Sequence, residues 1–174
     1  TIDAIANQTN SGINNGGVAE FEIADPTIAL QGSGTADNPN LVLYLDATDR
    51  QSMTLSFDAR DIDARDDAVQ QIVVQYRTAD TGEWADVPGG YIADATDASD
   101  ALVTPLSVTL PDDANGASKL EVRIMTANAN GSDEWVGIDN IHVTSQAAVA
   151  APPAIDPFIN EFHYDNALAP ASRT

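Results

Sequence analysis

Three carboxylates stand within one short stretch near the end of the chain, GSDEWVGIDNIHV at 131–143. Two of them precede a tryptophan, and the third, Asp139, lies inside an apolar run that predicts a β-strand. Side chains alternate along a strand, so we expect Asp139 on the same face as Trp135 and Ile141. Burying a carboxylate is costly unless a cation or hydrogen-bond donors compensate its charge. The stretch therefore predicts a cation bound at Asp139, or else a sheet-edge position where backbone amides or an arginine donate hydrogen bonds to this residue.

Calcium is the cation that the acidic loops of this chain suit best. It takes roughly six to eight oxygen ligands from carboxylates, amides and carbonyls. Two loops offer such groups: FDARDIDARDD at 57–67, which contains Asp61 and Asp63, and DATDASD at 94–100. Neither is an EF-hand, because counting from Asp61 puts an arginine at the fifth position and no glycine at the sixth. The arginines of the first loop could also neutralise its acids without a metal, so both interpretations stay open.

Exposed aromatic side chains offer a second kind of chemistry, the binding of sugars. An aromatic ring on a sheet face or loop stacks on a pyranose ring, while polar neighbours bind the hydroxyl groups. The candidates are Trp84, Tyr91 and Tyr44, whereas Trp135 is expected in the core. Because aromatic residues make up only 6% of the chain, glycan binding is the alternative interpretation and not the main one.

Catalytic chemistry has little support in the sequence. The two histidines, His142 and His163, belong to no metal-binding motif, and no sequence pattern places either beside a nucleophile. The tripeptide Gly-Ser-Gly at 32–34 predicts a turn, not a nucleophile elbow or a phosphate loop. We therefore predict a non-catalytic protein.

The net charge narrows the possible partners. The 174 residues include 27 Asp and Glu against 7 Lys and Arg, which gives a formal charge of −20 at pH 7. Such a surface repels nucleic-acid phosphates and anionic lipid headgroups, and it attracts cations. No apolar run is long enough to span a membrane, and the absence of cysteine excludes disulfides. Acidity and polar loops favour an extracellular location, although a solvated acidic face or a salty habitat would also explain the charge.

The elements that must position these residues are short strands. Alternating apolar and polar residues between turn signals predict an all-β fold, a two-sheet antiparallel sandwich of about eight or nine strands in a jelly-roll-like arrangement. In 51–62, for example, Met53, Leu55 and Phe57 share one face. The predicted strands are 19–24, 41–47, 51–62, 71–78, 83–87, 103–110, 119–126 and 135–144.

The predicted domain organisation has three parts. A β-sandwich covers 1–145, an Ala/Pro-rich linker covers 146–156, and a C-terminal strand and tail cover 157–174. The strand candidate PFINEFHY at 157–164 cannot be stable alone and needs the edge of a sheet. If this strand joins a sheet of a neighbouring copy, the protein self-associates. Repeated head-to-tail contacts of this kind give an open filament when the rotation between copies does not close a ring. Docking of the strand on its own sandwich is the simpler alternative. The residues expected to make this contact are Phe158, Ile159, Phe162 and Tyr164.

Three stretches carry a resemblance to a known group of proteins. DEWVGIDNIHVTS, LYLDATDRQSMTLSFDARDID and IVVQYRTADTGEWADVP resemble β-sandwich modules of secreted bacterial multidomain proteins, over about residues 18–145. Those modules often precede lamin-tail or extracellular nuclease domains and look akin to jelly-roll carbohydrate-binding modules. The resemblance implies a secreted or cell-surface protein, with Asp139 as a ligand of a structural calcium ion and Glu20 or Glu22 as its partners.

The tail carries a shorter resemblance. INEFHYDN at 159–166 is similar to the opening strand of a lamin-tail domain, whereas the following ALAPASRT departs from that family. Together these observations predict a non-catalytic, calcium-stabilised, extracellular sandwich with a structural or adhesive role, which assembles through its C-terminal strand. The alternative is a carbohydrate-binding accessory module of a larger secreted hydrolase or nuclease, with the tail as the stub of the next domain.

Overall fold

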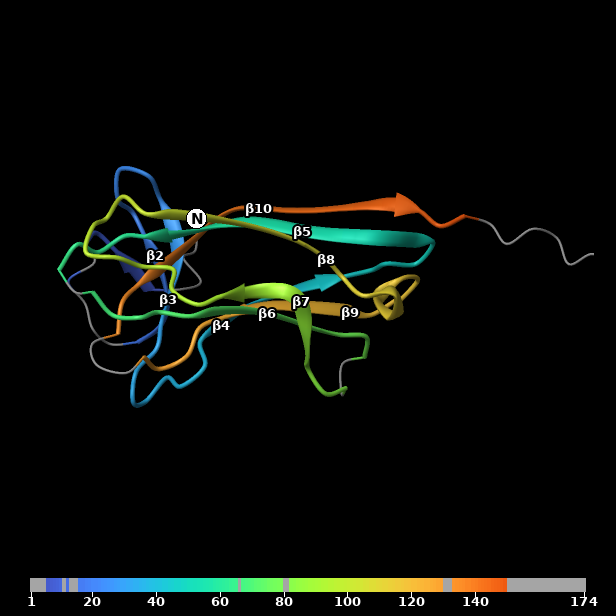
Figure 1. The fold of residues 1–174 in the computed structure, drawn as a ribbon, viewed down its shortest axis with the longest axis horizontal. Helices are drawn as coiled ribbons and strands as arrows, with labels where there is room; N and C mark the ends of the chain where they lie inside the picture. The colour runs from blue at the N-terminus through green and yellow to red at the C-terminus, as the bar shows by residue number, and fades with distance from the viewer. Residues whose placement is uncertain are drawn as a thin grey trace, which may run out of the picture.

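Two β-sheets packed face to face form the part of the protein that the structure describes (Figure 1). The computed structural model describes residues 6–10, 12, 16–65, 67–79, 82–129 and 133–149. One sheet has six strands in the order β1-β2-β3-β10-β5-β8, and the other has four in the order β4-β9-β6-β7. The elements are β1 (Ala6–Gln8), β2 (Gly17–Phe21), β3 (Thr27–Gln31), β4 (Asn40–Leu45), β5 (Arg50–Asp61), β6 (Ile72–Arg77), β7 (Ala85–Ile92), β8 (Val103–Thr109), the 3-10 helix η1 (Asp112–Ala114), β9 (Leu120–Met125) and β10 (Val136–Ala147).

The connections between strands give the sandwich its jelly-roll-like character. Paired strands run antiparallel except β1 and β2, which are parallel. The first three strands stay in the six-stranded sheet and β6 and β7 form a hairpin in the four-stranded sheet, but every other connection passes from one sheet to the other. The predicted fold class, an antiparallel two-sheet sandwich, is therefore confirmed.

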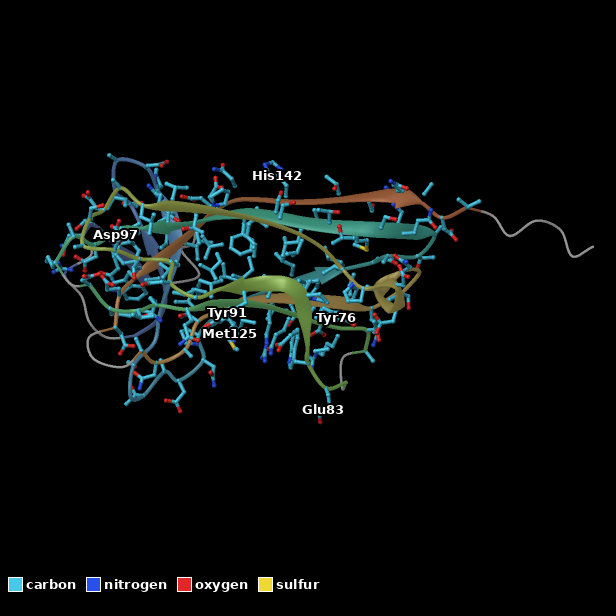
Figure 2. All side chains as sticks on the ribbon, viewed as in Figure 1. Tyr76, Glu83, Tyr91, Asp97, Met125 and His142 are labelled. Atoms are coloured by element: carbon cyan, nitrogen blue, oxygen red, sulfur yellow. The ribbon has the colours of Figure 1, made fainter. Side chains whose placement is uncertain are left out.

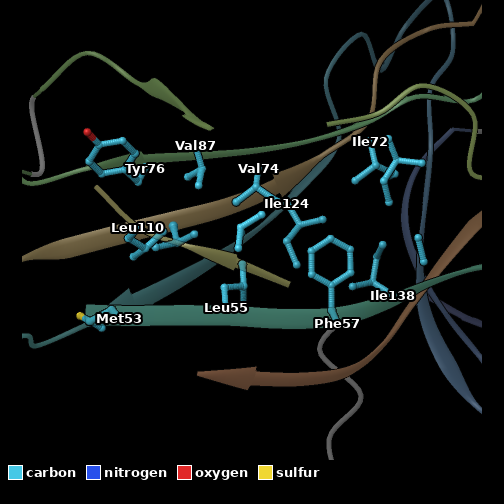
Figure 3. Packing of buried hydrophobic residues seen from close by; sticks show 14 of the residues in the cluster. Met53, Leu55, Phe57, Ile72, Val74, Tyr76, Val87, Leu110, Ile124 and Ile138 are labelled. Carbon is cyan, nitrogen blue, oxygen red and sulfur yellow. The ribbon is translucent and has the colours of Figure 1, made fainter. Parts of the chain in front are cut away.

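Alternation along the strands builds the core between the sheets. Met53, Leu55 and Phe57 of β5 are all buried, as the sequence predicts, and they face the four-stranded sheet (Figure 3). Opposite them lie the alternating apolar residues of β6 and β9, which are Ile72, Val74, Tyr76, Leu120, Val122 and Ile124. Each buried aliphatic or aromatic side chain contributes about 1.5–3 kcal/mol through its removal from water, so this layer is the main source of stability.

A smaller apolar cluster explains the tryptophan that precedes β10. Trp135 is buried and meets the edge of the Phe21 ring, with ring centroids 5.1 Å apart. Ala19, Ala29 and Ile62 complete this cluster. The predicted core role of Trp135 is confirmed, but its partners form a cluster separate from the main core between the sheets.

The sequence did not predict β1, β3 or η1, and it ended β7 too early. The differences at β3 and β7 have identifiable physical reasons. The strand β3 was not predicted, because four of its five residues are buried and the alternation that marks a strand is missing. The strand β7 continues through Pro88-Gly89-Gly90, a tripeptide that reads as a turn. Gly89 takes a positive φ of 77°, and the pairing of β7 with β6 shifts register nearby. A bulge therefore lets β7 bend without ending.

The last strand reaches slightly beyond the predicted sandwich boundary at 145. Gln146 and Ala147 still pair with β5. The rest of the predicted linker and the whole C-terminal strand candidate at 157–164 lie outside the described residues, so the predicted assembly contact stays a prediction. None of the helical segments in the described ranges has the length and apolar character of a membrane span.

Candidate functional site

Asp139, the first candidate from the sequence, is paired with an arginine. It lies opposite Asp58 of β5 in the six-stranded sheet. The guanidinium group of Arg60 approaches both Asp139 Oδ2, at 3.0 Å from Nη2, and Asp25 Oδ2, at 2.9 Å from Nη1. The side chain of Asp139 is only 20% exposed. This arrangement includes the arginine pairing that the sequence left open as the alternative to a cation. The sheet-edge position predicted with that pairing is wrong, because β10 lies between β3 and β5 inside the sheet.

A β-bulge next to Asp139 overturns one detail of the sequence prediction. Asn140 has a positive φ of 53°, and the register of β10 on β5 shifts between Asp139 and His142. As a result Ile141 turns to the main core, although unbroken alternation had placed it on the face of Asp139. The Asn140 side chain donates a hydrogen bond of 2.8 Å to Asp58 Oδ2, which gives this left-handed residue a local reason to be asparagine.

The other predicted calcium ligands do not gather around Asp139. Glu20 lines the same hollow of about 290 Å³ as Asp139, whereas Glu22 is exposed. Asp61 and Asp63 are buried elsewhere, at the end of β5 and in the loop that follows it. Within the described ranges, no group of three or more histidine, aspartate or glutamate residues is arranged to hold a metal ion. Calcium binding stays a prediction.

The two acidic loops do meet, and they form a buried carboxylate cluster. Asp61 accepts hydrogen bonds of 2.9 Å from the backbone amides of Asp63 and Asp97, which belong to the two loops. Glu134 is fully buried and its Oε2 accepts a hydrogen bond of 2.7 Å from the Ala68 amide. Its Oε1 atom has no hydrogen-bond partner in the described part of the chain.

Burial and mutual repulsion control the protonation of this cluster. Burial raises the pKa of Glu134, and the charges of Asp61 and Asp63 raise it further, while the Thr96 side chain and the Ala68 amide offset only part of the effect. Burial likewise raises the pKa of Asp61. The carboxylate of Asp63 forms an ion pair with Arg65. The cluster therefore favours a proton on Glu134 more than an exposed glutamate does.

The second set of candidates, the aromatic residues, converges on the outer face of the four-stranded sheet. Because β6 and β9 bury alternate residues, the residues between them point away from the core. In β6 these are Val73, Gln75 and Arg77, and in β9 they are Arg123 and Met125. Figure 2 shows Met125 on the outer side of this sheet and His142 on the outer side of the other sheet.

All three predicted glycan-binding residues lie on this face, which we call the aromatic face after Tyr44, Trp84 and Tyr91. Tyr44 in β4 stands opposite Glu121 and is 76% exposed. Tyr91 in β7 stands opposite Val73 and is 56% exposed. Trp84 directly precedes β7. The other aromatic side chains of the described ranges are all buried: Phe21, Phe57, Tyr76 and Trp135.

Two arginines hold the ring of Trp84. The Cζ atoms of Arg77 and Arg123 lie 4.5 Å and 4.2 Å from the centroid of the Trp84 ring. Guanidinium groups at this distance are attracted by the negative face of an indole. Burial and the neighbouring Arg77 charge lower the pKa of Arg123, which remains a cation at neutral pH. The stack fixes the orientation of the tryptophan before any ligand arrives.

Hydrogen bonds connect the polar groups of the aromatic face into two sets, and one arginine of each set stacks on Trp84. Arg77 pairs with Glu121 at 2.6 Å. Arg123 donates to Gln75 Oε1 at 2.8 Å, and Gln75 in turn donates to Asp86 at 2.7 Å. These side chains are fixed by one another, yet their remaining donor and acceptor positions can face a ligand.

Two hollows flank the Trp84 stack on the same face. One, of about 260 Å³, is lined by Tyr91, Gln75 and Met125 among others. The second, of about 450 Å³, is lined by Tyr44, Glu121 and the start of β9. Both combine an aromatic ring with polar groups, which is the lining that orients a small polar ligand.

The opposite outer face has a hollow whose lining includes Phe57, but this ring is buried in the core and does not offer an exposed aromatic surface. The hollow measures about 540 Å³ and is lined by Ser56, Asp58, Ser107 and His142 among others. Ser56 stands opposite His142 in the sheet, but no hydrogen bond joins the two side chains in the described structure, and Asp58 is bonded to Asn140. The contacts that activate a serine in a catalytic triad are therefore missing from this arrangement.

Comparisons with known proteins give similarities to solved structures only. No protein-family model and no curated protein matches the chain. A family 61 carbohydrate-binding module in complex with β-1,4-galactotriose is similar with a TM-score of 0.46 and 8% identity, over 71% of this chain and 72% of that one. A family 28 module specific for non-crystalline cellulose is similar with a TM-score of 0.47 and 11% identity, over 81% and 99%. Neither similarity assigns a ligand to this chain.

The structure thus brings together one predicted set of residues and disperses another. Tyr44, Trp84 and Tyr91 share one face, whereas the five predicted metal ligands do not form one site. Glu20 and Asp139 line one hollow, Asp61 and Asp63 belong to the buried cluster, and Glu22 is exposed. Sequence reasoning missed Arg77, Arg123 and the polar residues that connect them. A signal for these was present, because β6 and β9 carry polar residues at the positions between their buried ones.

The pairing of Asp139 with Arg60 predicts a stabilising role that needs no metal. Asp139→Ala should lower the free energy of unfolding by about 1.5–3 kcal/mol, the value of a hydrogen bond to a charged group. We expect the same loss with added calcium and with chelator, measured by urea unfolding. Glu22→Ala, at an exposed position, serves as the control. A chelator effect on the wild type that is absent in Asp139→Ala would instead establish the predicted calcium site.

The buried Glu134 predicts that stability falls as pH rises. Folding raises the pKa of this carboxyl, so the native state holds the proton more tightly than the unfolded state does. The native state therefore loses stability as pH rises from the unfolded-state pKa to the folded-state pKa. Glu134→Gln retains an acceptor for the Ala68 amide without the charge. The variant should therefore be more stable than the wild type at pH 7, by about 1.4 kcal/mol per unit of pKa shift, and equal to it at pH 4.

Urea unfolding between pH 4 and pH 8, in the presence of chelator, measures this difference. Glu22→Gln controls for the loss of one charge at an exposed position. A Glu134→Gln variant that is less stable than the wild type at pH 7 would show that the ionised carboxylate is the form that the fold requires.

Proposed function

We propose that this chain is a non-catalytic carbohydrate-binding module and that its ligand lies on the aromatic face. One observation carries the proposal. Among the described residues, the aromatic side chains that are not buried in a core are Tyr44, Trp84 and Tyr91, and all of them lie on one face of one sheet. Exposed aromatic residues gathered on a single face mark an interaction surface.

The chemistry of the aromatic face suits a sugar. The apolar faces of pyranose rings stack on aromatic rings, and their hydroxyl groups exchange hydrogen bonds with polar side chains. The face supplies both, since the ring of Trp84 stands beside the Arg123, Gln75 and Asp86 network. Because both arginines extend from the sheet beneath the tryptophan, we expect the ligand to meet the opposite side of the ring.

Preorganisation supports binding at this position. A side chain that is already held in place loses less conformational entropy when a ligand arrives. Trp84 is held by two guanidinium groups, and the Tyr91 hydroxyl donates a hydrogen bond of 2.9 Å to Gln71. Much of the face is therefore in place before binding.

The wider role that we propose is attachment to an extracellular polysaccharide. A module of this kind holds a larger secreted protein, such as a hydrolase or a nuclease, close to the glycan. The structural or adhesive role with assembly through 157–164 depends on residues outside those described, and no contact within the described ranges favours it over glycan binding.

Glycan-array binding followed by alanine substitution tests this function. We expect Trp84→Ala, Tyr91→Ala and Tyr44→Ala each to weaken binding about 30-fold, as the loss of about 2 kcal/mol at a central contact does. Circular dichroism should show an intact fold in all three, because none of these residues belongs to the core.

His142→Ala provides the matched control, because this residue lines the hollow on the opposite outer face. It should leave binding unchanged. A wild-type protein that binds no glycan, or binding that only His142→Ala removes, would exclude the aromatic face as the site.

A further inference from the structure

Resting on the proposed function, we infer that the ligand is an internal stretch of a neutral polysaccharide, which runs diagonally across all four strands of the sheet from Tyr91 to Tyr44. The inference concerns the length, the direction and the charge of the ligand. Each follows from a different feature of the aromatic face.

The direction follows from the strand register. Tyr91 in β7 and Met125 in β9 both stand opposite Val73, so they belong to the same row across the sheet. Tyr44 in β4 belongs to the row of Glu121. The two tyrosines therefore lie on the two edge strands and in rows four residues apart along β9, which places them at diagonal corners of the sheet.

The required length follows from strand geometry. Three steps between neighbouring strands span roughly 14 Å, and four residues along a strand span roughly 13 Å, so the diagonal is roughly 19 Å. This is about four times the spacing between neighbouring strands, and each ring of a linear glycan advances by about one such spacing. A chain of about four or five linked sugars therefore reaches from one tyrosine to the other.

The two hollows and the stack between them form one path. The hollow beside Tyr91 lies at one corner and the hollow beside Tyr44 lies at the other. Trp84 lies between the rows, because it contacts Arg123 of the middle row and Arg77 of the last one. Neither hollow is an enclosed cavity, so the glycan can continue beyond both corners.

The charge of the ligand follows from the balance of charges on the face. Arg77 is matched by Glu121, and Arg123 is linked through Gln75 to Asp86. The centre of the face is thus neutral, in a chain whose formal charge is −20. A polyanion would be repelled by the rest of the surface, and a polycation would find no unmatched carboxylate at the centre. A neutral glycan suits this face.

A length series tests the inference. Isothermal titration would use neutral gluco-, galacto-, manno- and xylo-oligosaccharides of one to six units. For the backbone that binds, we expect affinity to rise at least 100-fold between two and four units, because joining two contacts makes the second one intramolecular. The gain should then level off, and binding should change little between 50 mM and 500 mM NaCl.

Substitution of Tyr44 or Tyr91, one at a time, tests the path of the ligand more directly. In Tyr44→Ala the tetramer should lose most of its advantage over the dimer, whereas the dimer itself should bind as it does to the wild type if it occupies the Tyr91 corner. Tyr91→Ala should reduce the affinity for both. Tyr44→Phe keeps the ring and should retain the full length dependence, and His142→Ala controls for an unrelated surface.

The outcomes separate this inference from the proposed function. Binding by single sugars that equals binding by tetramers, with loss in Trp84→Ala, would overturn the diagonal path and leave the glycan-binding function intact. Binding of a uronate polymer or of chitosan in preference to the neutral panel would overturn the neutrality of the ligand. No binding to any glycan would remove the proposed function itself.

Discussion

The alternation of side chains along β6 and β9 is the constraint on which both the core and the candidate site depend. Burying Val74 and Ile124 between the sheets forces the residues beside them, Gln75 and Arg123, to the outer surface. The apolar half of each strand provides the stability, and the polar half is thereby presented as a fixed surface. A site on the outer face of strands whose inner face is packed in the core shares the rigidity of that core.

The charges of acidic and basic side chains are compensated in a different way in each of three parts of the molecule. On the six-stranded sheet, Arg60 binds the carboxylates of Asp25 and Asp139. At the end of the core, Glu134 is buried beside other acids, and a raised pKa is the consequence. The aromatic face balances each arginine with one carboxylate. The large negative charge of the chain therefore says little about any single site, because each local environment has its own compensation.

Much of the fold follows from sequence patterns. The buried faces of β5, β6 and β9 agree with the predicted alternation, and so does the core position of Trp135. The failures have identifiable causes. β3 is buried on both faces and so lacks a two-residue period, and the bulge at Asn140 reverses the face that Ile141 occupies. Sequence alternation predicts neither burial from both sides nor a change of register, because both depend on what packs against the strand.

The sequence by itself determined which residues could bind a sugar or a cation and where most of the strands would be. It identified Tyr44, Trp84 and Tyr91 as candidates from their residue type, and Asp139 from its position in an apolar run. Only the tertiary structure decided that the three aromatic residues share a face and that Arg60 pairs with Asp139. The physical reason is that these partners lie far apart in the chain, and strand order and register, set by packing of the two sheets, bring them together.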